Sequence, residues 1–274
     1  MEPGLYVAAT PIGNLRDITI RVLDALAGCD LIACEDTRVT AKLLRHYGIR
    51  KKTVSYTDHN ANVSGPKLIE GVKEGKSVVL VSDAGTPLVS DPGLRLVAEA
   101  REHGIPVIPL PGASATLTAL VASGLTSETW IFAGFLPSKQ GARIARLRSL
   151  ATNSSTVIFF ESPNRLEKAL ADMVMVFGGD RIACVARELT KLHEDIRSAS
   201  LSELADEYAG RSIKGEIVIL IEPADDATSL DTEALLIELL QSLSVSQAAA
   251  EAAQLTGGSK RELYQQALAL KEKQ

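Results

Sequence analysis

Short apolar runs recur along the first 222 residues and alternate with segments whose apolar residues return at helical spacing. Runs such as LYVAA and SVVLVS are nearly continuous, which is typical of strands buried on both faces of a parallel sheet. We predict strands at residues 5–9, 31–35, 53–56, 77–82, 105–110, 129–135, 155–160, 181–186 and 216–222. Helices are predicted between them at 18–27, 40–47, 64–74, 93–103, 113–123, 143–150, 165–177 and 201–208.

Apolar strands that alternate with helices predict an α/β fold with mostly parallel sheets covered on both faces. About ten strands would be many for a single sheet, and SGLTSET at 123–129 has the composition of a linker. We therefore predict two α/β domains, at residues 1–118 and 119–224.

A polar segment, PADDATSLD, follows Glu222, and the pattern from 230 to 274 is purely helical. Gly257 and Gly258 separate two short helical segments there, which weakly resembles a helix-turn-helix. We expect this C-terminal extension to form a helical hairpin that packs on the body or on a second subunit, rather than a reader of DNA.

Composition narrows the class of protein. Apolar residues make up 46% of the chain but aromatic residues only 4%, so we expect an aliphatic core. No apolar run approaches the ~18 residues of a membrane span, and MEPGLYVAAT lacks the basic-then-apolar order of a signal peptide. The three cysteines lack metal-ligand spacing. We expect a reduced, cytoplasmic protein without a membrane or a metal partner.

The net charge of −5 argues against non-specific binding to nucleic acid. However, the segment 38–52 holds six Lys and Arg residues and no acid, and 129–160 holds four basic residues and no acid. Two basic patches on an acidic chain suggest a localised anionic partner. Either patch alone is better interpreted as a solvated helix face.

The segments that follow the predicted strands share an unusual composition. In open α/β sheets, ligands bind beyond the carboxyl ends of the strands. Nearly every such segment carries Pro, Gly or a charged cluster: TPIGN, EDTR, TDHN, SDAGTPLVSDPG, PGASA, GFLPSK, ESPNR, RELTK and KGE. No P-loop, G-x-G-x-x-G or G-x-S-x-G motif is present. We expect these loops to hold a polar ligand mainly by peptide groups.

The chain contains, in this order, ATPIGNLRDIT, EDTR, HN, VSDAGTPLVSDPG, PGASA, GFLPSK, ESPNR, RELTK and GE. Together these motifs resemble the tetrapyrrole-methylase superfamily over roughly residues 4–222. Within it, the chain is most similar to the enzymes that methylate a cytidine ribose 2′-hydroxyl in the decoding centre of 16S rRNA. The resemblance implies S-adenosylmethionine as cofactor, bound between the two α/β domains. It also implies 16S rRNA in the small ribosomal subunit as partner, and a homodimer.

The family pattern also implies which residues bind the cofactor, mostly through backbone atoms. In the first domain, Val81, Ser82 and Asp83 take the place of the relatives' Gly-Gly-Asp. The full implied set is Pro11, Val81, Ser82, Asp83, Thr86, Ser114 and Ala115, with Glu161 and Leu189 from the second domain. Two positions depart from the pattern: Asn164 stands where the family usually has His, and Ala61 where an acid often follows His-Asn.

Methyl transfer to a ribose hydroxyl benefits from a base, because the hydroxyl is a poor nucleophile. The candidates for this role are His59, Asp36, Glu188 and Lys191. Each also has a structural interpretation, as a bonded loop residue for His59 and as an ion-pair member for the others. Arg38, Lys139, Arg143 and Arg165 are the candidates for contacts with RNA phosphates, although each could equally be an ordinary surface or helix-end charge.

Two other functions stay open at this point. One is a methyltransferase for a tetrapyrrole or another small acceptor, against which the basic patches count. The other is a non-catalytic ribosome-assembly or RNA-binding module, against which the dense small-residue loops count. We also expect Gly85 to be essential to the loop that contains it, because only glycine tolerates open backbone angles and close approach.

Overall fold

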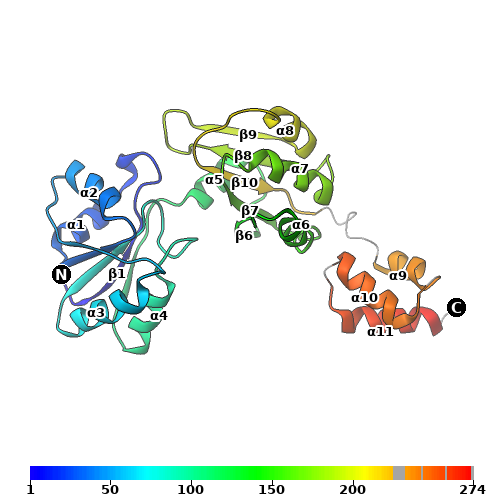
Figure 1. Cartoon of the computed structure of the whole chain (residues 1–274), viewed down its shortest axis with the longest axis horizontal. Coiled ribbons are helices and arrows are strands. Elements are labelled where there is room, and N and C mark those ends of the chain that lie inside the picture. The colour runs from blue at the N-terminus through cyan, green and yellow to red at the C-terminus, as the bar shows by residue number, and fades with distance from the viewer. Residues whose placement is uncertain (225–231, 242, 257, 273–274) are drawn as a thin grey trace. The chain divides into compact units, whose positions relative to one another are not determined.

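The computed structural model describes residues 1–224, 232–241, 243–256 and 258–272. These residues fall into two compact units (Figure 1). The first unit comprises residues 1–118 together with the short segment 188–194. The second comprises 119–187 and 195–274.

The first unit is built on an entirely parallel five-stranded sheet. Its strands are β1 (Gly4–Ala8), β2 (Leu31–Cys34), β3 (Thr53–Ser55), β4 (Ser77–Val81) and β5 (Val107–Leu110), in the order β3-β2-β4-β1-β5. All five residues of β4 are buried, and successive residues such as Val78 and Val79 pack into cores on opposite faces. Burial on both faces explains why the strand sequences are continuous apolar runs.

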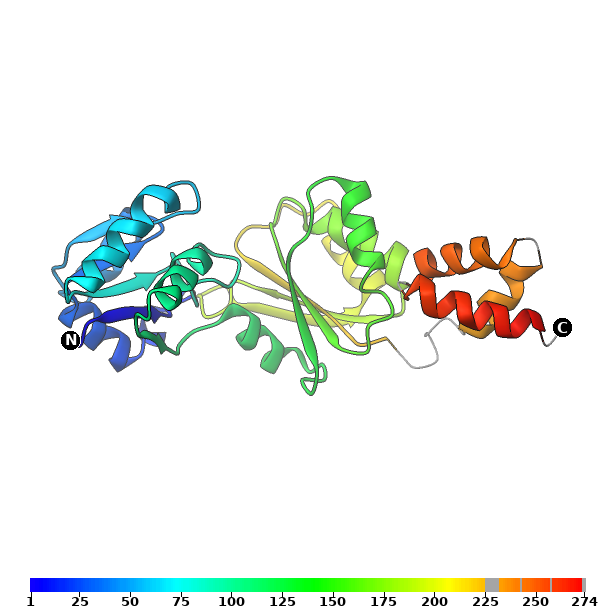
Figure 2. The same ribbon diagram turned by 90° about the horizontal axis from the view of Figure 1, so that it is seen from below.

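Helices cover both faces of the first sheet (Figures 1 and 2). The helices α1 (Ile20–Gly28) and α2 (Thr37–His46) pack on one face, and α3 (Ala61–Lys73) and α4 (Leu94–Glu102) pack on the other. A 3₁₀ turn, η1 (Leu15–Asp17), precedes α1. The predicted α/β architecture of this unit is therefore confirmed.

The second unit holds a mixed sheet, not the mostly parallel one that the sequence pattern indicated. Its strands β6 (Trp130–Phe135), β7 (Thr156–Glu161), β8 (Ile182–Arg187), β9 (Asp195–Ser200) and β10 (Ile217–Ile221) lie in the order β6-β7-β10-β8-β9. Only β6 and β7 are parallel to each other. No strand was predicted at β9, because this edge strand has polar, partly exposed residues instead of an apolar run.

Four helices accompany the second sheet or lead into it. They are α5 (Ala115–Ser123), which begins in the first unit, α6 (Gln140–Arg148), α7 (Leu166–Phe177) and α8 (Leu201–Tyr208). One large core contains residues of α6, α7 and α8 together with β7, β8 and β10.

A buried ion pair joins α6 to α7. Arg143 and Asp172 have side chains only 4% and 3% exposed, with the Arg143 Nη2 atom 2.6 Å from Asp172 Oδ2. Gln140 donates a further hydrogen bond to Asp172, and Arg143 donates one to the Ser138 carbonyl. Arg143 is therefore a structural residue. The prediction that it contacts RNA phosphates is wrong, because its charge is neutralised and inaccessible.

The described residues of the C-terminal segment form three helices, α9 (Thr232–Leu240), α10 (Val245–Thr256) and α11 (Lys260–Glu272). The helical pattern is confirmed, but the expected helical hairpin is wrong because a third helix joins the other two. They share a small core of their own that includes Leu236, Ala249, Ala252 and Leu263.

None of the helices in the described ranges is long and apolar enough to span a bilayer. The same residues contain no cluster of three or more His, Cys, Asp and Glu side chains that could bind a metal ion. The three cysteines are buried and unpaired.

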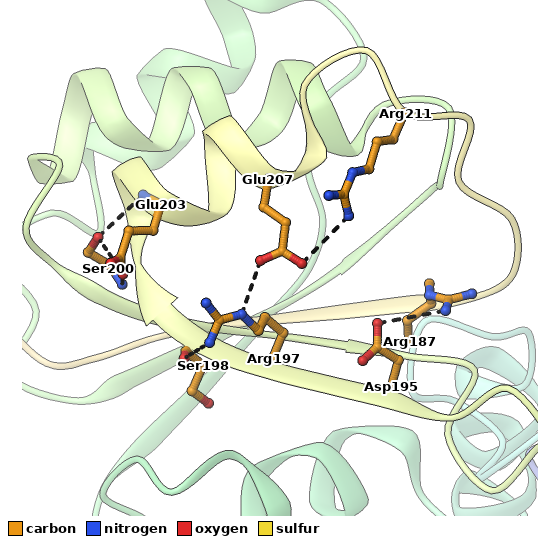
Figure 3. Close-up of polar contacts among 8 residues, drawn as sticks. All are labelled: Arg187, Asp195, Arg197, Ser198, Ser200, Glu203, Glu207 and Arg211. Atoms are coloured by element: carbon orange, nitrogen blue, oxygen red, sulfur yellow. Dashed lines mark hydrogen bonds and ion pairs between the residues drawn. The ribbon is translucent and has the colours of Figure 1, made fainter.

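Ion pairs on the surface of the second unit contrast with the buried pair. Glu207 of α8 accepts from Arg197 of β9 at 3.0 Å and lies 3.7 Å from Arg211 (Figure 3). The Arg197 and Arg211 side chains are 48% and 58% exposed, so solvent screens both interactions.

Replacing Asp172 with alanine should lower the free energy of unfolding by about 3–5 kcal/mol, because Arg143 would remain buried and unpaired. The double variant Arg143→Met, Asp172→Leu should recover most of that loss, since no buried charge is left. Chemical denaturation followed by circular dichroism measures both. Arg197→Ala is the control, because it removes only an exposed pair and should have little effect. Equal losses in Asp172→Ala and in the control would contradict this account.

Candidate functional site

The loops that follow β1, β4 and β5 are bonded to one another at the carboxyl edge of the first sheet. Thr10 and Gly85 exchange two backbone hydrogen bonds, of 2.8 and 2.9 Å. The Thr10 hydroxyl donates to the Ser82 carbonyl at 3.2 Å, and the Thr86 hydroxyl donates to the Ala113 carbonyl at 3.2 Å. We call residues 9–14, 82–93 and 111–115 the loop cluster.

Gly85 lies at the centre of the loop cluster. Its φ of +78° is in the left-handed region, and a Cβ atom there would lie 3.3 Å from Ile12 Cγ2. The same loop holds two non-glycine residues with positive φ, Leu88 at 73° and Ser90 at 65°. The loop thus holds three residues in the left-handed region, and the backbone angle at Gly85 agrees with the need for glycine expected there.

The segment 188–194 belongs to the first unit, although it connects β8 to β9 of the second sheet. The Asn14 amide donates to the Thr190 hydroxyl at 3.0 Å. A Cβ atom on Gly13 would lie 3.1 Å from the Leu189 carbonyl oxygen and 2.5 Å from Lys191 Cγ. Leu189, which the family pattern assigned to the second domain, thus packs beside the loop after β1.

The structure brings together the implied cofactor residues of the first unit. Pro11 and Ser82 are buried in the loop cluster. Asp83, Thr86 and Ser114 are half-buried there. Val81 ends β4, Ala115 begins α5, and Leu189 is only 6% exposed. Sequence reasoning missed Thr10 and Thr190, which join the loops, since neither has a distinctive local pattern.

Asp36 serves as the N-cap of α2. Its carboxylate accepts from the Arg38 amide at 2.8 Å and from the Arg38 guanidinium at 2.6–3.1 Å. The Asp36 amide donates to Asp83 at 3.0 Å, which links the loop after β2 to the loop cluster. Hydrogen bonds from Arg38 hold the pKa of Asp36 at about 2. A carboxylate with so low a pKa is a poor proton acceptor near neutral pH.

The pKa values of three other carboxyl groups near the carboxyl edge of the first sheet are shifted in the opposite direction, upward. Burial raises the pKa of Glu35, Asp83 and Asp91 above their ordinary values. Mutual repulsion adds to the effect, since Asp83 raises the pKa of both Glu35 and Asp91. These groups concentrate negative charge at the carboxyl edge of β2 and β4, where it suits a cationic ligand.

In the second unit, Glu161 ends β7 with a fully buried side chain. Its Oε1 atom accepts from the Ser162 amide at 2.6 Å and from two nitrogens of Arg165, at 2.7 and 2.6 Å. Its Oε2 atom is buried and has no partner. A buried carboxylate oxygen without a partner is costly, and it could accept a hydrogen bond from a hydroxyl or amine of a ligand. The residues present therefore fit a nucleoside cofactor.

The remaining predicted residues lie on the surface or in other pairs. His59 is exposed in the turn between β3 and α3, where Asn60 bonds the Thr57 amide and the Ser55 carbonyl. Glu188 and Lys191 form an ion pair of 2.7 Å.

Lys139 is an exposed N-cap of α6. Ala61, where the family often has an acid, packs in the core under α3, which favours an apolar residue at that position.

Known families match nearly the whole chain. The family described as Tetrapyrrole (Corrin/Porphyrin) Methylases matches residues 4–205, and the RsmI C-terminal HTH domain matches residues 226–271. The second match identifies the C-terminal helices as a helix-turn-helix domain, of which the sequence pattern was only a weak indication.

Curated relatives match this chain at high identity. A protein of Mesorhizobium japonicum named ribosomal RNA small subunit methyltransferase I is 54% identical over 99% of this chain and 94% of its own length. A protein of the same name from Pseudomonas aeruginosa is 46% identical over 96% of both chains.

Solved structures share the fold at lower identity. The methyltransferase CobJ has a TM-score of 0.62 and 22% identity over 81% of this chain and 94% of its own. Uroporphyrin-III C-methyltransferase from Thermus thermophilus, complexed with S-adenyl homocysteine, has a TM-score of 0.54 and 18% identity over 79% of this chain and 96% of its own. These likenesses confirm the predicted fold class.

Replacing Asp91 with asparagine should stabilise the first unit at pH 7. The raised pKa of Asp91 means that the folded state binds its proton more tightly than the unfolded state. The free energy of unfolding therefore falls as the pH rises through the raised pKa of Asp91. The asparagine variant should lose less stability between pH 4 and pH 7 than the parent, as measured by denaturant unfolding at several pH values.

The control is Asp30→Asn, whose carboxylate accepts from the Ser77 amide and hydroxyl and has a lowered pKa. It should have the opposite effect and destabilise the protein at neutral pH. If both variants shifted stability in the same direction, burial would not be the dominant influence on Asp91.

Proposed function

On the premise that this chain belongs to the tetrapyrrole methylase family of S-adenosylmethionine-dependent methyltransferases, we propose that it methylates the RNA of the small ribosomal subunit. Its specific target, on this proposal, is the ribose 2′-hydroxyl of a cytidine in the decoding centre of 16S rRNA. The observation that carries methylation of this RNA is the 54% identity over 99% of the chain with a relative named ribosomal RNA small subunit methyltransferase I. The cytidine ribose as target is the finer part of the proposal and rests on the motif resemblance.

Residues at two sheet edges supply the proposed cofactor contacts. In the first unit, the proposed contacts are backbone groups of the loop cluster and of Leu189. In the second unit, the proposed contact is Glu161, whose unpartnered Oε2 atom would accept a hydrogen bond from a ligand hydroxyl or amine. When bound, S-adenosylmethionine supplies a methyl group activated by a sulfonium charge. The half-buried carboxyl groups Glu35, Asp83 and Asp91 favour that positive charge electrostatically.

The proton of the ribose hydroxyl needs an acceptor near neutral pH. Asp36, with a pKa of about 2, is better suited to positioning Arg38 and the loop after β2 than to accepting a proton. We keep His59 and the Glu188–Lys191 pair as the candidates for that role. Glu188 and Lys191 lie in the segment that packs beside the loop after β1.

Arg38, Lys139 and Arg165 remain proposed contacts with RNA phosphates, because their side chains keep access to solvent. The proposed assembly is a homodimer, and the proposed location is the cytoplasm, where the substrate is found. The relatives at 54% and 46% identity are named for ribosomal RNA, whereas the uroporphyrin-III C-methyltransferase is 18% identical and shares only the fold, so we do not propose a tetrapyrrole as acceptor.

Purified protein should transfer labelled methyl groups from S-adenosylmethionine to small ribosomal subunits that lack the modification. Mass spectrometry of the digested 16S rRNA should place one new 2′-O-methyl group on a cytidine. Naked 16S rRNA and a corrinoid precursor serve as comparison substrates. Methylation of the corrinoid alone, or of a base atom in the RNA, would contradict the proposal.

Gly85→Val should abolish cofactor binding without unfolding the protein. The valine would need a left-handed backbone and would crowd Ile12. Calorimetric titration with S-adenosylmethionine measures the loss, and circular dichroism checks the fold. Gly104→Val is the matched control: φ there is +67°, yet a Cβ atom would meet nothing within 4 Å. Normal titration of the Gly85 variant would exclude the loop cluster as the cofactor site.

A further inference from the structure

The outer face of α2 carries a row of exposed basic side chains. Arg38, Lys42 and Arg45 are spaced by four and three residues, which places them on one face of the helix. All three are exposed, whereas Leu43 and Leu44 are buried against the sheet. Two more exposed basic residues, Arg50 and Lys52, follow the helix before β3. We call these five residues the α2 basic face.

Most of this charge is not neutralised within the protein. Arg38 is paired with Asp36, although its side chain is still 87% exposed. The other four form no ion pair with any residue in the part of the chain that the structure describes. The segment 37–52 contains no Asp or Glu at all, in a chain whose net charge is −5.

Ordinary helix stabilisation accounts for only part of the pattern. Arg45 lies in the last turn of α2, where a cation interacts favourably with the helix dipole. Lys42 lies in the middle of the helix, and Arg50 and Lys52 lie beyond it. By contrast, Lys67 and Lys73 of α3 have Glu70 three residues away on either side.

The α2 basic face begins beside the loop cluster. The chain leaves the carboxyl end of β2 and enters α2 at Asp36, whose amide is bonded to Asp83. Because β3 is parallel to β2, α2 must run back toward the opposite edge of the sheet. The row from Arg38 to Arg45 therefore extends about 10 Å away from the candidate site along the outer surface.

We propose that the α2 basic face binds the phosphate backbone of the substrate RNA next to the nucleotide that is methylated. This inference rests on the proposed function. A strand whose target ribose lies at the carboxyl edge carries its neighbouring phosphates outward, where unpaired cations along α2 meet them. Phosphate contacts of this kind position the RNA without reading its sequence.

The first test compares Lys42→Gln, Arg45→Gln with the control Lys67→Gln, Lys73→Gln, which makes the same charge change on the opposite face of the sheet. The α2 variant should raise the KM for small ribosomal subunits about tenfold, with kcat and S-adenosylmethionine affinity unchanged. The plot of log affinity against log salt concentration should become shallower by about 1.4, since two single-strand phosphate contacts are lost. An unchanged KM, or an equal rise in the α3 control, would overturn the proposal.

A second test identifies the partner directly. A photo-cross-linking amino acid in place of Lys42 in the full chain should attach to 16S rRNA when the complex with small subunits is irradiated. A cross-link to a ribosomal protein only would mean that α2 meets an acidic protein surface instead, and would refute RNA binding.

The parent protein separates this proposal from the proposed function. If it fails to methylate small subunits, the function is wrong and so is any inference that rests on it. If it methylates them and the α2 variant keeps the parental KM, only the role of α2 is wrong.

Discussion

The central strand β4 is buried on both faces and flanked by β1 and β2, and this constraint governs the first unit. A strand buried in this way has no room for polar chemistry along its length, because every side chain must pack in one of two cores. Polar groups can appear only where the strand ends. The long loop after Val81 and the loops after β1 and β5 accordingly bond to one another, and they present peptide groups and carboxylates at a single edge.

Charge of opposite sign is segregated around that edge. Burial raises the pKa of Glu35, Asp83 and Asp91, and the charge of Asp83 raises the pKa of Glu35 and Asp91 further. By contrast, the segment of α2 carries cations with no acid among them. Asp36 lies at the boundary, since it caps α2, pairs with Arg38 and donates its amide to Asp83. A cationic cofactor and an anionic RNA require opposite potentials, and this arrangement offers both within one unit.

The second unit uses its charges differently. Arg143 and Asp172 are removed from solvent to join two helices, while Glu161 places three donors on one carboxylate oxygen and leaves the other buried and unbonded. The first arrangement is satisfied and structural. The second has an unmet acceptor, which is the feature that a bound ligand would complete.

The sequence by itself determined the alternating elements, the parallel first sheet, the strand-end motifs and the family, because periodicity and turn residues act over a few positions. Tertiary structure alone decided which distant groups meet. Asn14 bonds Thr190 across 176 positions, and β9 exists because β8 offers it an edge. The sequence predicted Arg143 to be a surface cation, but in the structure it donates a hydrogen bond to Asp172, 29 residues away. Such pairings depend on packing between elements, and no local pattern encodes the partner.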